Sequence, residues 1–343
     1  MTITLGKGEL AEEALRNYFI EHGYFVVRSL PYTYNEFDIT DIDLWLYCKS
    51  SPFTRERTNV DIKNKKAPQA FERIIWTKGL QTTLGLERSI VATTSNRKEA
   101  KDFSAANDII LLDGEFLNTL TSKTSDLQRI TEEELLVAIA SENLGGREDS
   151  WKKRYLTSKA RLLTKLNFDG CNEYLKEIHY FLEQTVTRAG RSTAPIRCLY
   201  INIAFFLICV DFIAKHCITL DQKSSMTFLS NGFNYGERGK ERTESITSAA
   251  IKLASSVIAS SSISSALQLE IDKQLRGRPV EILADFFSKN SNVNSLLNTA
   301  KQFESLSYSK SVLLPSHLPV ELQGILGLLT DFFRLDRKKM LNL

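Results

Sequence analysis

The hydrophobic pattern of the chain changes between residues 121 and 130, and this change limits the folds that the chain can adopt. Before it, short apolar runs of strand length alternate with amphipathic helical segments, whereas after it nearly every apolar run has helical spacing. The residues at the change, TSKTSDLQRI, are mostly polar, as is typical of a linker. We therefore predict an α/β domain over residues 1–120, a linker over 121–130 and an all-α domain over 131–343.

Eight segments of regular structure are expected in the N-terminal domain. A helix, GELAEEALRNYFIEHG, has its apolar residues at helical spacing and ends at Gly23, since glycine readily adopts the conformation that terminates helices. Three strands follow, YFVVRSL, DIDLWLY and TNVDIKNK, with a polar loop between the second and third. A helix opened by Pro68, the strand SIVATT, the helix KEAKDFSAA and the strand DIILLD complete an α-β-β-β-α-β-α-β order in a mixed sheet.

The C-terminal part of the chain is expected to be helical. The 343 residues include 16 glycines and 7 prolines, fewer than in an average globular protein, which favours long helices over an all-β sandwich or barrel. A serine-rich stretch at 255–267 keeps several apolar residues, so we interpret it as a closely packed helix. The expected helices are 131–142, 151–166, 171–188, 195–217, 243–274, 279–288, 294–304 and 320–335.

One run is long and apolar enough to raise the question of a membrane. CLYINIAFFLICVDFIA, residues 198–214, reaches the lower limit for a membrane span, but it contains Asp211, which is costly inside a bilayer. We interpret it as a buried core helix, with a membrane helix as the alternative. The five cysteines form no CxxC pair, and the N-terminal residues lack the apolar run of a signal peptide. We therefore expect reduced thiols in a cytoplasmic protein that has no membrane partner.

The second and third strands carry the residues best suited to chemistry. Since side chains alternate along a strand, Asp43 shares one face of its strand with Asp41, while Asp61 and Lys63 share one face of the next. If these strands pair as a hairpin, Asp43, Asp61 and Lys63 converge on one side of the sheet. A hard divalent cation relieves the repulsion between two carboxylates by binding oxygens of both. The arrangement predicts metal-assisted hydrolysis of phosphodiester bonds, and the plain alternative is a solvated strand face.

These elements, taken in order, resemble the PD-(D/E)XK nuclease superfamily, whose fold is called restriction-endonuclease-like. EEALRNYFIEHGY (12–24) is similar to the opening helix of its Mrr-like and Holliday-junction-resolvase-like branches. IDLW (42–45) is similar to their I-D-L strand, and VDIKNKK (60–66) to their (D/E)xK strand. The resemblance covers about residues 6–115. Two departures are Asp61 in place of the more usual Glu and the lack of a proline before Asp43.

The resemblance implies a role for each residue that matches the motif. Asp43 is implied as the carboxylate that bridges the metal, and Asp61 as the second ligand, with the carbonyl of Ile62 alongside. Lys63 is implied to position the attacking water or to stabilise the pentavalent phosphate. The implied cofactor is Mg²⁺, for which Mn²⁺ can substitute.

Two helices supply further candidates in the light of the same resemblance. Glu12 is implied as the acid of the opening helix, either beyond the metal's direct ligands or at a second metal, and Glu9 is the alternative, three residues earlier on a nearby face. Gln69 and Gln81 lie on the helix after the motif strand, where relatives often place a glutamine near the active site. A solvent-exposed helix position is the alternative for each glutamine.

Basic residues give two candidate surfaces for DNA, although the net charge of +3 neither demands nor excludes such a partner. WKKRYLTSKARLLTK, residues 151–165, carries six basic residues and no acid, so one face of a helix there can follow a phosphate backbone. A solvated face of a bundle helix is the alternative. The candidate phosphate contacts are Lys65 and Lys66 beside the motif strand, and Lys152, Lys153 and Arg154 on the basic helix.

The sequence therefore predicts a Mg²⁺-dependent deoxyribonuclease joined to a helical domain for binding, recognition or oligomerisation. The resemblance implies a role in bacterial restriction or anti-phage defence, and a homodimer or a partner subunit formed through the helical domain. One alternative is a catalytically inactive DNA-binding or scaffolding subunit of a larger complex. Another is a nuclease of repair or recombination. No Walker A loop is present, so the chain has no ATP-binding motif of its own.

Overall fold

The computed structural model describes residues 4–35, 37–65, 69–122, 129–140, 150–257, 269–270 and 279–341. Contacts group the chain into two compact units. The first comprises Met1–Thr164, Ser192–Phe205 and Ala300–Val312, and the second comprises Lys165–Arg191, Phe206–Thr299 and Leu313–Leu343. The two units are defined by contacts between residues, whereas the predicted domains at 1–120 and 131–343 were defined by sequence pattern. The predicted domain boundaries therefore stay a prediction.

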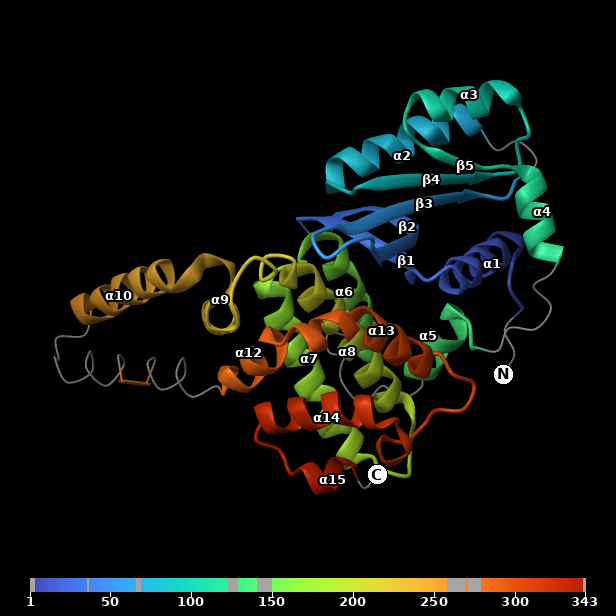
Figure 1. Ribbon diagram of the computed structural model, residues 1–343. Coiled ribbons are helices and arrows are strands. Elements are labelled where there is room, and N and C mark those ends of the chain that lie inside the picture. The colour runs from blue at the N-terminus through green and yellow to red at the C-terminus, as the bar shows by residue number, and fades with distance from the viewer. Residues whose placement is uncertain are drawn as a thin grey trace. The chain divides into compact units, whose positions relative to one another are not determined.

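A five-stranded mixed sheet forms the centre of the first unit (Figure 1). The strands stand in chain order, and the first three are antiparallel, whereas the third pairs in parallel with the fourth and the fourth with the fifth. Helical crossovers join the parallel strands, as parallel pairing requires. The strands are β1 (Phe25–Tyr34), β2 (Phe37–Lys49), β3 (Arg55–Lys63), β4 (Arg88–Thr93) and β5 (Ile110–Leu112).

Helices cover both faces of this sheet. In Figure 1, α1 (Lys7–Glu21) lies below the sheet, and α2 (Ala70–Leu84) and α3 (Lys98–Ala106) lie above it. The predicted α-β-β-β-α-β-α-β order is confirmed, because the period-two and helical patterns each sort one apolar face inward. The core on the α1 side includes Leu15, Phe19, Leu44, Leu46, Val60 and Ile62, and the core on the α2 side includes Ile74, Val91 and Ile109.

Buried charges fasten α1 to helical segments from later in the chain. Glu132, at the start of α5 (Glu132–Ala140), accepts hydrogen bonds from Lys159 Nζ at 2.6 Å and from the hydroxyl of Tyr308 at 2.5 Å. The guanidinium of Arg16 on α1 lies 3.9 Å from the centre of the Tyr308 ring and donates to Glu304 at 2.9 Å. All five side chains are buried.

The network favours the ionised form of the Glu132 carboxyl although it excludes water. Burial alone raises the pKa of the Glu132 carboxyl, but the charges of Lys159 and Arg16 outweigh burial and hold that pKa below its usual value. Lys159 lies on α6 (Trp151–Thr164), which packs against β1, and Glu304 on α13 (Asn290–Ser307). These ion pairs therefore fix α5, α6 and the end of α13 beside α1, in the same unit as the sheet.

The described part of the second unit is helical. The fold is thus a mixed α/β region followed by helices, which confirms the coarse prediction of fold class. Phe168 packs directly on Gly232, where an added Cβ would lie 2.2 Å from its ring. The helices of this unit are α7 (Phe168–Thr187), the later residues of α8 (Ala194–Ala214), α9 (Gln222–Tyr235), α10 (Gly239–Val257), α12 (Val280–Ser288), the earlier residues of α13, α14 (Val320–Phe332) and α15 (Arg337–Leu341).

Some segments differ from expectation or lie outside the described residues. Helices α4 (Gly114–Ser122), α9 and α15 were not predicted. The predicted linker and the serine-rich helix lie mostly outside the described residues, which omit 123–128 and 258–268.

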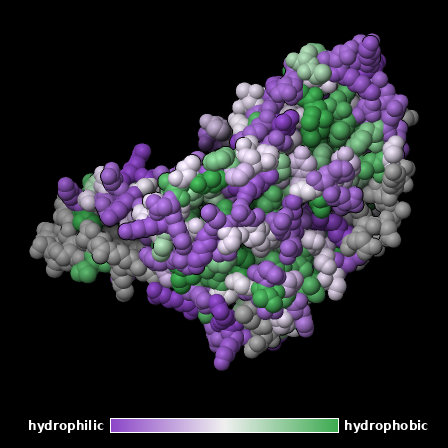
Figure 2. Space-filling view, viewed as in Figure 1, coloured by the Kyte–Doolittle hydropathy of each residue, from purple (hydrophilic) through white to green (hydrophobic). Residues whose placement is uncertain are grey.

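Helix α8 alone among the described helices is long and apolar enough to cross a membrane, and 94% of its most apolar window is buried in the protein. On the face drawn in Figure 2, hydrophilic side chains cover much of the surface, with hydrophobic ones between them.

Candidate active site

The register of β2 and β3 brings the two predicted carboxylates together. Leu44 pairs with Val60 in this antiparallel ladder, so the next pair outward is Asp43 and Asp61. An oxygen of Asp43 accepts a hydrogen bond from the backbone N–H of Ile62 at 2.6 Å. Asp43 therefore lies across β3 at the point where the ladder between the two strands ends.

Asp43 is held in a mostly buried position beside two positive charges. Burial raises the pKa of its carboxyl, and the Ile62 N–H and the charges of Lys63 and Arg73 reduce this rise without cancelling it. The charge of Lys63 thus acts on Asp43, and the clustering of its ammonium with the two carboxylates stays a prediction. Because burial disfavours the ionised form of Asp43, a further positive charge bound beside it would stabilise that form.

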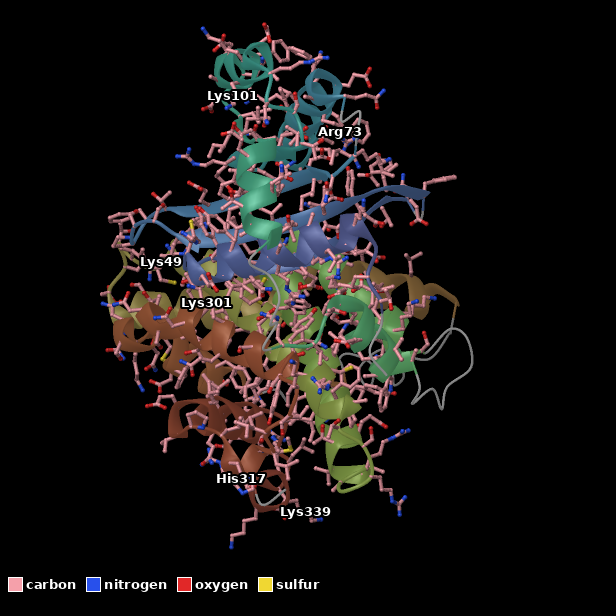
Figure 3. All side chains as sticks on the ribbon, turned by 90° about the vertical axis from the view of Figure 1, so that its right-hand side faces the viewer. Lys49, Arg73, Lys101, Lys301, His317 and Lys339 are labelled. Atoms are coloured by element: carbon pink, nitrogen blue, oxygen red, sulfur yellow. The ribbon has the colours of Figure 1, made fainter. Side chains whose placement is uncertain are left out.

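The guanidinium of Arg73 binds the carboxylate of Asp61. Its Nε donates to one oxygen of Asp61 at 2.8 Å, and a terminal nitrogen of the same guanidinium donates to the other oxygen. Asp61 is buried, whereas the Arg73 side chain, on the first turn of α2, is 23% exposed. Burial lowers the pKa of Arg73. Figure 3 labels Arg73 on α2. The sequence analysis did not identify this residue, and the one available signal was its place in the helix that follows the motif strand.

The acid of the opening helix is also engaged by an arginine. Glu12 accepts a hydrogen bond from Nε of Arg28 at 2.7 Å, and burial raises the pKa of its carboxyl in spite of that charge. The charge of Asp43 raises this pKa further, and the role of Glu12 at the candidate site stays a prediction. Glu9 instead accepts from the N–H of Gly6 at 2.7 Å and thereby caps α1. Of the two alternatives, Glu12 is the one whose carboxyl is affected by the charge of Asp43.

The donor set suits Mg²⁺ only in part. Within the described ranges, no three His, Cys, Asp or Glu side chains are grouped so that they could hold a metal ion. Mg²⁺ in proteins is commonly bound by one or two carboxylates, with waters and substrate phosphates completing the shell, so Asp43 and Asp61 fit that chemistry. They fit it on the condition that Arg73 leaves the oxygens of Asp61. The N–H of Ile62 serves Asp43, and the role of its carbonyl stays a prediction.

The structure describes three of the four other residues that the sequence analysis predicted near this pair. Lys65 is exposed just after β3, and Gln69 is exposed in a left-handed conformation where α2 begins. Gln81 is not brought to the site: it is buried two helical turns beyond Arg73 and donates to the carbonyl of Glu87 at 3.1 Å. Lys66 lies outside the described residues.

The basic helix α6 contributes to a groove beside the outer end of β2. Lys152 and Lys153 are exposed and line a cavity of about 600 Å³ together with residues 31–33 and 38–41 of the β1–β2 hairpin. Asp41, two residues before Asp43, is part of the same lining. Arg154 is only partly exposed. The groove therefore places two lysines on the side of the hairpin that leads to the candidate carboxylates.

One residue of the basic helix has a different role from the one expected. Lys159 is fully buried in its ion pair with Glu132, and so it cannot contact a phosphate backbone. Helix α6 has no acid of its own, but α5 supplies one.

Comparison of the chain with protein-family models, with curated proteins and with solved structures finds no match.

Proposed function

We propose that the chain is a metal-dependent DNA endonuclease with a restriction-endonuclease-like N-terminal domain, acting in bacterial restriction or anti-phage defence. The observation that carries the proposal is that Asp43 and Asp61 directly follow the last β2–β3 pair, Leu44 and Val60, with the charge of Lys63 acting on Asp43. Asp43, Asp61 and Lys63 are the residues that match the strand and (D/E)xK motifs of the superfamily in the sequence. Further support comes from Glu12 on α1, whose carboxyl is affected by the charge of Asp43.

In the proposed reaction, Asp43 and Asp61 hold Mg²⁺, which when bound lowers the pKa of water and neutralises charge on the phosphate. Asp43 must be ionised to bind it, and Lys63 favours that ionised form. The Lys63 ammonium then orients the attacking water or stabilises the negative charge that develops on the phosphate. The Ile62 N–H holds the Asp43 carboxylate in place through the 2.6 Å hydrogen bond.

DNA is proposed to reach the site along the groove between α6 and the β1–β2 hairpin. Lys152 and Lys153 contact phosphates there, and form no ion pair with other described residues. Such contacts supply affinity without sequence preference.

Incubation with supercoiled plasmid, linear duplex and single-stranded DNA tests the proposed function. We expect cleavage with Mg²⁺ or Mn²⁺, none with EDTA, and none by Asp61→Asn in either metal. Asp102→Asn is the matched control, because Asp102 is an exposed aspartate on α3 of the same unit. Cleavage by Asp61→Asn at the wild-type rate would exclude Asp61 as a ligand.

One observation favours a second candidate, a catalytically inactive nuclease-fold subunit that binds DNA or a partner. Both oxygens of Asp61 are bound by Arg73, and Glu12 is bound by Arg28, so two of the proposed acids already have cationic partners. This candidate predicts metal-independent DNA binding with no cleavage of any of the three substrates. Cleavage that depends on metal and on Asp61 would exclude it.

A further inference from the structure

The two arginines at the candidate site are held in different ways. Arg28 is 2% exposed and contacts three carboxylates, those of Glu12, Glu13 and Glu133. Moving the Arg28 guanidinium away from these carboxylates would leave several buried charges unpaired, which is costly in free energy. Arg28 is therefore a fixed part of the fold.

Arg73 is held by far less. Its side chain is 23% exposed, and within the described residues its ion pair is with Asp61 alone. It extends from the first turn of a helix, so rotation of its side-chain bonds can turn the guanidinium toward solvent without moving the backbone. Breaking an ion pair that has one partly solvated member costs less than breaking one whose members are both buried.

The guanidinium also covers the atoms that a metal would need. It contacts both oxygens of Asp61, and its charge acts on Asp43 as well. A single positive group thus pairs with Asp61 and also acts on Asp43, the two carboxylates that the proposed function assigns to Mg²⁺. The planar fork of donors that suits a carboxylate suits a phosphate equally well.

We propose that Arg73 is an exchangeable cation of this site. It pairs with Asp61 while no metal is bound, and its side chain turns to a phosphate of the DNA when Mg²⁺ binds Asp61. The inference rests on the proposed function, because it assumes that Asp43 and Asp61 are metal ligands. It makes Arg73 a direct competitor of the metal in the free protein and a substrate-binding residue in the complex.

Titration of the full chain with Mg²⁺ and with Mn²⁺ in the absence of DNA, followed by calorimetry, tests the competition without measuring activity. Arg73→Gln keeps a polar side chain but removes the charge, and we expect it to bind either metal about tenfold more tightly than the wild type, or better, as the loss of one charge-assisted interaction implies. Arg73→Lys retains a point charge without the fork, and its affinity should fall between the two. The control is Arg88→Gln, whose arginine pairs with Glu56 on an exposed part of the same sheet; its metal affinity should match the wild type.

The inference also predicts coupling between Arg73 and Asp61. In an Asp61→Asn background, Arg73→Gln should no longer tighten metal binding, because the competed ligand is gone. Equal or weaker metal binding by Arg73→Gln, in protein that melts at the wild-type temperature, would overturn the inference alone. Failure of every protein to bind either metal would overturn the inference together with the proposed metal site.

Discussion

Replacing Lys159 by methionine should destabilise the first unit strongly. Methionine matches the length of lysine but removes the ammonium that lies 2.6 Å from Glu132, in a pair whose side chains are 0% and 2% exposed. Removing one partner of such a pair typically costs 3–5 kcal/mol, since an unpaired charge is left in a dry interior. Glu132 would still accept from the hydroxyls of Tyr155 and Tyr308, so we expect about 3 kcal/mol, at the lower end of that range.

The pH dependence of this loss follows from the carboxyl of Glu132. In the wild type its pKa lies below the usual value, so its contribution to stability is present above the ordinary pKa of glutamate and is lost as the pH falls through the folded-state pKa. Without Lys159 burial dominates and raises that pKa, so the variant is least stable at high pH and recovers as Glu132 becomes protonated. The difference from the wild type should therefore be smaller at about pH 5 than at about pH 7.5.

Urea denaturation followed by tryptophan fluorescence measures these changes, because Trp45 and Trp151 are both buried in the first unit. The double variant Lys159→Met with Glu132→Gln should recover about 1 kcal/mol or more and lose the pH dependence, since no charge is left unpaired. Lys153→Met, at an exposed position of the same helix, is the control and should change stability by about 0.5 kcal/mol or less. A loss below about 1 kcal/mol for Lys159→Met, or a double variant less stable than the single one, would refute the reasoning.

Three further predictions concern the candidate site and groove. Lys63→Ala should lose cleavage but keep most of its DNA affinity in a filter-binding assay, and an equal loss of both would contradict a catalytic role. Replacing Lys152 and Lys153 together by glutamine should make the slope of log K against log salt shallower by up to about 1.8, near 0.9 per lost phosphate contact, and an unchanged slope would remove the groove as a DNA surface. Because burial raises the pKa of Asp43, cleavage at limiting Mg²⁺ should fall on acidification at a higher pH than an ordinary aspartate would give, and a profile without that fall would contradict its role as a ligand.

The alternation of side chains predicted much of the α/β region. The i, i+2 spacing of Asp61 and Lys63 predicted a shared strand face for them, because strand geometry is local, and the β2–β3 ladder ends one pair before Asp43 and Asp61. The helices α1, α2 and α3 were likewise evident from apolar spacing and from glycine at or near the ends of the first two. Helices α4 and α9 were missed because they are rich in serine, threonine, asparagine and glycine, which form helices weakly.

The charge partners could not be predicted from the sequence, because they come from elsewhere in the chain. Arg73 meets Asp61 across 12 residues, and Lys159 meets Glu132 across 27. From the sequence alone, the basic residues of α6 were expected on one solvated face of the helix. The packing of α5 beside α6 shows that Lys159 belongs to the core, whereas Lys152 lines the groove. Pattern predicts which face a residue takes, whereas the partner on that face depends on the tertiary fold.

Anomalous diffraction from crystals soaked in Mn²⁺ tests the central claim most directly. The account predicts one strong peak within about 2.0–2.6 Å of carboxylate oxygens from both Asp43 and Asp61, with the guanidinium of Arg73 displaced from Asp61. Crystals in which Arg73 still covers Asp61, and in which the metal is absent from this position at saturating Mn²⁺, would contradict the claim that the two carboxylates form a metal site.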